Sequence, residues 1–201
     1  MSLQASIEAI GRELVTCTRD CEGVSCNRKP GQIPRCLFLE RGGSAKGGAI
    51  VVGVNPGRAT EKERNYYVVR HSTYAATVEW FENEGNTHGR EHPYYVHLRH
   101  LLRAIGLGGP IVWTELAKCE SAKGVASVPL QTFRRCSGSF LQRELAIPQI
   151  QKWPLFGVGL EAFKALAYLF PRRTVIGCHI QQAAGGTSRV YSIDATHERR
   201  P

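Results

Sequence analysis

The amino-acid sequence predicts an α/β fold, a three-layer α/β/α sandwich around a central, mainly parallel four-stranded sheet. Two observations support this prediction. Predicted strands and helices alternate along the chain, as in consecutive βαβ units, and the strands are continuous apolar runs, as expected for strands buried on both faces. With 201 residues and 42% hydrophobic content, the chain is long enough for one well-packed domain. We therefore expect a single domain over residues 1–201.

Strands are predicted where short apolar runs stop at Gly, Pro or a polar residue. They lie within 49–57, 110–117, 155–159 and 173–180. Helices are predicted where apolar residues recur at helical spacing, at 6–15, about 75–84, 94–105, 129–145 and 160–169. Between these elements, 20–46 is rich in Gly, Pro, Arg and Lys, and 58–93 is polar. We expect the N-terminal helix and the Cys-rich loop, about 5–46, to pack onto the sheet.

The charge balance favours a polyanionic partner such as nucleic acid. Lys and Arg number 26 against 17 Asp and Glu, which gives a formal charge of +9. No apolar run approaches the roughly 20 residues that a membrane-spanning helix needs, and the N-terminus does not resemble a secretory signal. We expect a cytoplasmic monomer that does not bind membranes.

Seven cysteines in a chain without an export signal argue against a disulfide framework, because the cytosol keeps thiols reduced. Metal binding is the leading alternative. Thiolates from the N-terminal loop, where Cys17, Cys21 and Cys26 lie, could join Cys119 and Cys136 to hold a 4Fe-4S cluster or a tetrahedral zinc ion. For Cys36 and Cys178, packing as small apolar residues is the simpler interpretation.

Three polar residues lie at or near the ends of predicted strands: Asn55, Glu115 and His179. Because the ends of parallel strands meet at one edge of a sheet, these side chains could converge on one pocket. Taken singly, each has an ordinary structural interpretation. Their shared position predicts a ligand site there.

The segment Gly53-Val54-Asn55-Pro56-Gly57 resembles the first motif of the single-strand-selective and mismatch-specific branches of the uracil-DNA glycosylase superfamily. The resemblance to this superfamily extends over nearly the whole chain. That resemblance implies that Asn55 orients the hydrolytic water and that the surrounding motif binds the substrate. It also implies DNA as partner, either single-stranded or containing a lesion.

The cysteines instead resemble those of the thermostable branch of the superfamily, which holds a 4Fe-4S cluster. Cys119 and Cys136 match its second ligand pair, and Cys17 matches its first ligand. The remaining ligand is Cys21 or Cys26; the distance from Cys26 to the strand at Ile50 fits better. The resemblance therefore implies Cys17, Cys26, Cys119 and Cys136 as ligands, with zinc as the alternative metal.

The segment Val175 to His179 resembles the approach to the second motif of the superfamily. The resemblance implies that His179 stabilises the negative charge on the departing base. The proline that usually follows this His is Ile180 here, and residues 181–186 would replace the loop that wedges into the minor groove.

Glu115 stands where the iron–sulfur branch carries an Asn that reads the uracil edge. An ionised Glu can only accept hydrogen bonds, so it would repel uracil O4 unless it were protonated, and would suit a base edge with an amino donor. Alternatively, Glu115 is structural. We expect a ring such as that of Tyr67 to stack on the base, although it could instead fill the core.

The resemblance thus implies a hydrolase that removes a damaged or deaminated base, uracil or a related one, from DNA. The alternatives are a non-catalytic nucleic-acid-binding protein that keeps the fold and the cluster, and an enzyme acting on a free nucleotide or nucleoside.

Overall fold

The computed structural model describes residues 1–26, 29–42, 47–82, 92–124, 127–182 and 189–196, and only the backbone beyond Cys178. It is an α/β protein with one mixed, mostly parallel sheet in the order β2-β4-β3-β6-β7-β8. The central strands are β3 (Ala49–Gly53), β4 (Ile111–Glu115), β6 (Leu155–Val158) and β7 (Val175–Gln182). The pairings of these four strands with one another are all parallel, which confirms the four predicted parallel strands.

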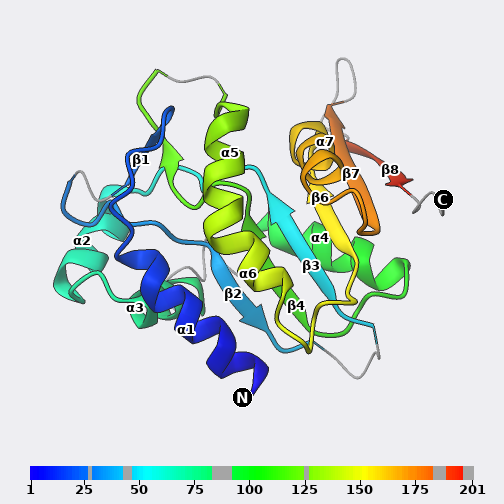
Figure 1. Cartoon of the computed structure of the whole chain (residues 1–201), viewed down its shortest axis with the longest axis horizontal. Helices are drawn as coiled ribbons and strands as arrows, with labels where there is room; N and C mark the ends of the chain where they lie inside the picture. Colours follow the sequence, from blue (N-terminus) through cyan, green and yellow to red (C-terminus); the bar gives the residue numbers. More distant parts are fainter. Residues whose placement is uncertain (27–28, 43–46, 83–91, 125–126, 183–188, 197–201) are drawn as a thin grey trace.

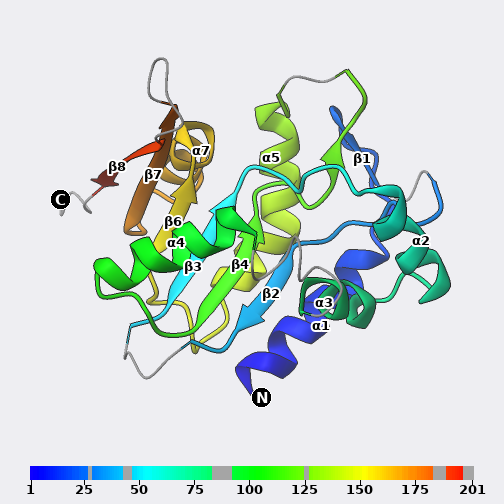
Figure 2. The ribbon, with the colours of Figure 1, turned by 180° about the vertical axis from the view of Figure 1, so that it is seen from behind.

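The helices cover both faces of the sheet. They are α1 (Leu3–Val15), α2 (Glu61–Val69), α3 (Tyr74–Glu82), α4 (Pro93–Ala104), α5 (Leu130–Cys136), α6 (Gln142–Leu145) and α7 (Leu160–Leu169). A π-helical turn, η2 (Ser137–Leu141), joins α5 to α6. Helices α1, α5, α6 and α7 lie on the near face in Figure 1, and α4 covers the opposite face in Figure 2. Helices on both faces agree with the predicted α/β class, but the sheet has six strands where four were predicted.

Alternate residues of the central strands feed two separate hydrophobic cores. In β3, Ile50 and Val52 join the core beneath α1 and α5, whereas Ala49 and Val51 join the core beneath α4. Because side chains alternate between the faces of a strand, a strand buried on both faces is apolar at every position. This explains the uninterrupted apolar run of β3.

Two strands of the sheet differ from the prediction. The edge strand β2 (Leu37–Glu40) lies within the predicted irregular loop 20–46 and pairs antiparallel with β4. The other edge strand, β8 (Arg189–Thr196), pairs antiparallel with β7. Strand β2 was missed because its apolar run, Leu37 to Leu39, is short and lies in a segment rich in Gly, Pro and basic residues. Strand β8 was missed because its sequence carries no continuous apolar run.

The region 58–93 also holds more helix than predicted. Helix α2 was missed because its sequence is polar, with Tyr67 as its buried residue. It begins at Thr60, whose hydroxyl caps the helix by accepting a hydrogen bond from the Glu63 N–H at 3.2 Å. The predicted short helix near 75–84 corresponds to α3.

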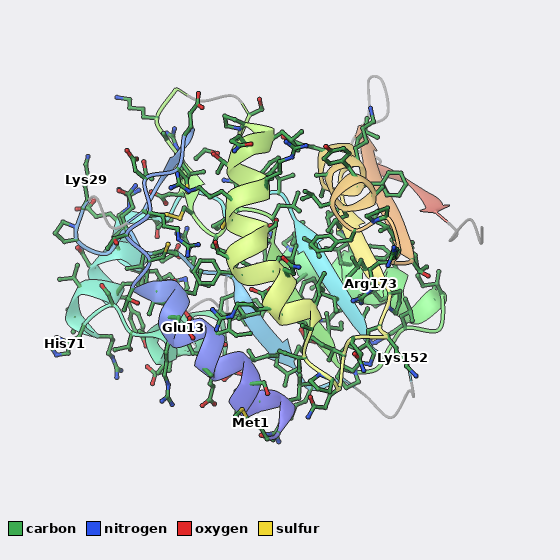
Figure 3. All side chains as sticks on the ribbon, in the orientation of Figure 1. Met1, Glu13, Lys29, His71, Lys152 and Arg173 are labelled. Carbon is green, nitrogen blue, oxygen red and sulfur yellow. A yellow bond between two sulfur atoms is a disulfide. The ribbon has the colours of Figure 1, made fainter. Side chains whose placement is uncertain are left out.

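Helix α1 is attached to the sheet by its apolar face and to α6 by an ion pair. Ile7, Ile10 and Leu14 are buried in the core. On the outer side, Glu13, labelled in Figure 3, receives two hydrogen bonds from the Arg143 guanidinium, at 2.7 and 2.8 Å. The N-terminal helix therefore packs on the sheet, as predicted.

Basic side chains are not confined to one end of the molecule. Lys29 lies at one end, and Lys152 and Arg173 lie at the other (Figure 3). Across the described part of the chain, no helix has both the length and the apolar character needed to cross a membrane.

Candidate functional site

Asn55 lies where the strand order of the sheet reverses. From β3 the chain continues to β4 on one side, and later to β6 on the other side. In open α/β sheets such a reversal leaves a crevice at the carboxyl ends of the strands, where ligands commonly bind. Asn55 follows the end of β3 at Gly53 by two residues, so it lies at this crevice.

The amide group of Asn55 is held in one orientation. Its Nδ2 donates to the Cys119 carbonyl at 3.4 Å, to Ser121 Oγ at 3.0 Å and to the Pro56 carbonyl at 3.2 Å. Two of these partners are carbonyls, which only accept, so the NH2 group must face them. Among the described residues no hydrogen-bond donor contacts Asn55 Oδ1. The arrangement leaves a fixed acceptor for a water molecule or a ligand.

The turn that carries Asn55 is anchored by two buried charged residues that the sequence analysis did not identify. Glu120 Oε2 accepts a hydrogen bond from the Ala59 N–H at 2.8 Å, and Arg35 donates to the Gly57 carbonyl. The two side chains are paired, with Arg35 Nη2 3.6 Å from Glu120 Oε2. Burial favours a higher pKa for Glu120, but the hydrogen bonds from Ala59 and Gln32 and the nearby arginines lower that pKa overall. An ionised Glu120 therefore fixes the turn.

Gly57 lies at the open end of this turn. It is exposed, and a side chain there would meet nothing within 4 Å. Pro56 is buried and Val54 is half-buried against the core. Of the predicted substrate-binding motif, the backbone at Gly57 is thus the part most open to a ligand.

Glu115 lies beside Gly53 at the ends of the paired strands β4 and β3. Its carboxyl group fills the space that a side chain at position 53 would occupy, which explains the glycine. Oε2 is buried and has no hydrogen-bond partner among the described residues. Burial raises the pKa of Glu115 to about 8, although the charges of Lys118 and Arg35 act to lower it.

The surroundings of Glu115 come from three other elements. Tyr94 and Tyr95 of α4, Cys36 before β2 and Cys178 of β7 all lie on this face. Burial, and then the charge of Glu115, raises the pKa of the Tyr94 hydroxyl. Burial likewise raises the pKa of the Cys178 thiol to about 11. These groups are uncharged at neutral pH, so Glu115 lies in a weakly polar environment.

His179 is placed only by its backbone. It lies in β7, one residue beyond Cys178, which pairs with Val158 at the end of β6. Its side chain lies outside the part of the chain that the structure describes, as do residues 183–186 of the predicted wedge loop. The crevice at the ends of β3 and β6 is thus bordered by β7 on the side away from Glu115.

The expectation that the ring of Tyr67 stacks on a base needs correction. Tyr67 is 1% exposed, packs against Trp80 and donates to Glu63 Oε1 at 2.9 Å, so its ring fills the core and is not open to a base. Two nearby basic residues are held by ion pairs. Lys118 is fully buried and paired with Glu144, and Arg64 Nη2 lies 2.6 Å from Glu120 Oε1.

Five of the seven cysteines line one pocket beside the turn of Asn55. They are Cys17, Cys21, Cys26, Cys119 and Cys136, and their apolar neighbours in the pocket include Leu14, Val24, Ala117 and Phe140. The short strands β1 (Val24–Ser25) and β5 (Glu120–Ser121) pair antiparallel and bring the N-terminal loop to the end of β4. Thus Cys26 and Cys119, far apart in sequence, become neighbours, with Cα atoms 5.5 Å apart.

This pocket fits a thiolate-bound metal in its donor set. The structure joins Cys26 and Cys119 in a disulfide, where the sequence analysis predicted two metal-bound thiolates. Within the described residues no three candidate ligands are arranged around one point. Nevertheless, four or more sulfurs in an apolar pocket match the ligands of iron–sulfur clusters and structural zinc. The Lys118 N–H lies 3.3 Å from Cys136 Sγ, a hydrogen bond that would stabilise a thiolate there.

The fold and these residues define an α/β protein with polar side chains at the strand ends where the strand order reverses, and with a thiol-lined pocket beside the turn of Asn55. No protein-family model and no curated protein matches this chain. Its function must therefore be inferred from the residues of the site.

Proposed function

We propose that this protein is a DNA glycosylase-like hydrolase, which cleaves the N-glycosidic bond of a damaged or deaminated base in DNA. The observation that carries this proposal is the geometry of Asn55. Its NH2 group is fixed by three acceptors, and its Oδ1 is left without a donor among the described residues, at the crevice where the strand order reverses. The chain's resemblance to the glycosylase superfamily supports the choice of reaction.

In this mechanism the target nucleotide swings out of the base stack into the crevice. Asn55 Oδ1 accepts a hydrogen bond from a water molecule, whose oxygen attacks C1′ of the sugar as the bond from C1′ to the base nitrogen breaks. The bond's electron pair leaves with the base, and the water proton neutralises the base afterwards. Backbone amides beyond Pro56, together with His179 as the resemblance implies, would stabilise the negative charge on the departing base.

Incubation with a panel of oligonucleotides tests this function. Duplex and single-stranded oligonucleotides with one uracil, hypoxanthine or xanthine are incubated with the protein, and alkaline cleavage then reveals abasic sites. We expect cleavage at one or more lesions and none at the matched undamaged base. The second candidate function is a non-catalytic nucleic-acid-binding protein, which the replacement of a base-reading Asn by Glu115 favours. This second function is correct if no abasic site forms while the oligonucleotides bind with an affinity that falls steeply with salt.

We further propose that Cys17, Cys26, Cys119 and Cys136 hold a 4Fe-4S cluster, with zinc as the alternative. These residues lie in three segments that the thiol pocket brings together. When bound, such a group would supply structural cross-linking, fixing the N-terminal loop to α5 and to the end of β4. Because Cys21 also lines the pocket, it is the alternative to Cys26 as the fourth metal ligand.

Metal content and visible absorption of protein purified without oxygen test this ligand set. We expect the wild-type chain to contain stoichiometric iron and sulfide and to absorb in the visible range, and Cys136→Ser to lose both. Cys21→Ser should retain them. Cys178→Ala is the matched control, because Cys178 is buried in the other core. A colourless protein with stoichiometric zinc favours the alternative metal, and Cys136→Ser protein that keeps its metal contradicts the ligand set.

A further inference from the structure

We propose that Glu115 recognises the extruded base through a neutral carboxyl group, which pairs with a base edge carrying an N–H next to a C=O. This inference rests on the proposed function and names the part of the crevice that selects the base. Uracil and hypoxanthine have such an edge. The proposal gives a role to the residue that departs most from the superfamily pattern.

The position of the carboxyl group is the first support. It lies against the backbone of Gly53 at the strand end, two residues from Asn55. Oε2 is buried, and no described residue hydrogen-bonds to it. Glu115 as a whole is only partly buried. A buried polar oxygen without a partner is unfavourable, and a ligand that supplied the partner would relieve it.

The charges around Glu115 are the second support. The cations that act on it are Lys118 and Arg35, but Lys118 Nζ lies 2.8 Å from Glu144 Oε1 and Arg35 Nε lies 3.1 Å from Glu63 Oε1. The other groups that interact with it are the thiols and hydroxyls described above, whose own pKa values are raised. No described cation is therefore dedicated to a Glu115 carboxylate. Burial raises the pKa of Glu115 to about 8, so the neutral acid predominates at pH 7.

Hydrogen-bonding chemistry explains why the neutral form matters. A carboxylic acid presents an O–H donor next to a C=O acceptor, the same pattern as the side-chain amide of Asn or Gln. It can accept from the N–H of a uracil edge and donate to the adjacent C=O. The carboxylate form cannot donate, and would repel the C=O. A protonated Glu115 thus restores the recognition that an ionised Glu would abolish.

Binding measured against pH tests the proposal. The probe is an oligonucleotide with 2′-fluoro-2′-deoxyuridine, chosen because its glycosidic bond resists cleavage; the control is the same strand with a tetrahydrofuran abasic analogue. If only the neutral acid binds, the uracil-dependent part of the wild-type affinity should fall about fourfold between pH 6.5 and 8.5. Glu115→Gln keeps the donor and acceptor at every pH, so its affinity should not show this fall. Titration of the base itself affects both proteins equally.

Two further measurements make the outcome decisive. Thermal melting at pH 6 should show that Glu115→Gln is folded, and 13C NMR of Glu-labelled protein should show a carboxyl resonance that titrates near pH 8 and is absent from this variant. A fall in affinity shared by both proteins, or a Glu115 carboxyl that titrates near 4.5, overturns this inference even if lesions are excised. If no lesion is excised, but the uracil-dependent affinity still falls with pH in the wild-type protein and not in Glu115→Gln, the proposed function is overturned and this inference stands.

Discussion

Replacing Lys118 by Met is expected to lower the free energy of unfolding by about 3 to 5 kcal/mol, the range for breaking a buried ion pair. Lys118 and Glu144 are both 0% exposed, and Nζ lies 2.8 Å from one carboxylate oxygen and 3.0 Å from the other. The Thr114 hydroxyl also donates to Glu144, at 2.7 Å. Without the ammonium group, Glu144 would be a buried charge compensated by that hydroxyl alone. Urea unfolding followed by circular dichroism at pH 7 measures the loss.

The matched control for this prediction is the double variant Lys118→Met/Glu144→Met. Removal of both charges leaves apolar side chains of similar volume, and such replacements are often neutral or stabilising. We expect the double variant to recover most of the stability lost in the single one. If Lys118→Met unfolds at the same urea concentration as the wild-type protein, the pair is not a determinant of the fold.

Replacing Asn55 by Ala is expected to slow excision on the order of 10²- to 10³-fold, because the acceptor that holds the attacking water is lost. This is the range found when an enzyme loses one preorganised hydrogen-bonding group that stabilises its transition state. Because the base contacts remain, binding of a cleavage-resistant oligonucleotide should change little. Single-turnover excision of the best substrate from the lesion panel measures the rate.

Ser121→Ala provides the comparison for Asn55. It removes one of the acceptors that orient the Asn55 NH2 group and leaves the Cys119 and Pro56 carbonyls in place. We expect a smaller loss of rate than for Asn55→Ala. A wild-type rate in Asn55→Ala would remove Asn55 from the mechanism.

The four parallel strands could be predicted because each is buried on both faces, so its apolar run is independent of where the neighbouring strands lie. Strand β2 could not be predicted in this way. Its four residues follow a turn in which Cys36 adopts a positive φ of 69°, and its ladder with β4 is what makes it a strand. Pairing partners of edge strands are tertiary information, which local patterns do not contain.

The site was partly predictable, because its polar residues follow strands that could themselves be predicted. Asn55 and Glu115 follow from the rule that strand ends share an edge, and the two residues do lie at neighbouring strand ends. The pair Arg35 and Glu120 left no signal, because ion pairs between residues far apart in sequence have no characteristic spacing. Tyr67 was misplaced because an aromatic residue on a short polar helix can face either the core or a ligand, and here it faces the core.

Cys119 belongs both to the thiol pocket and to the hydrogen bonds that orient Asn55. Its side chain lines the thiol pocket, while its carbonyl oxygen accepts a hydrogen bond from Asn55. A side chain that lines the pocket can be replaced without moving the main chain, but the carbonyl moves only with the backbone at Cys119. A change that shifted the backbone leading into β5 would therefore also turn the amide of Asn55. The thiol pocket and the acceptor of Asn55 are coupled through this one backbone position.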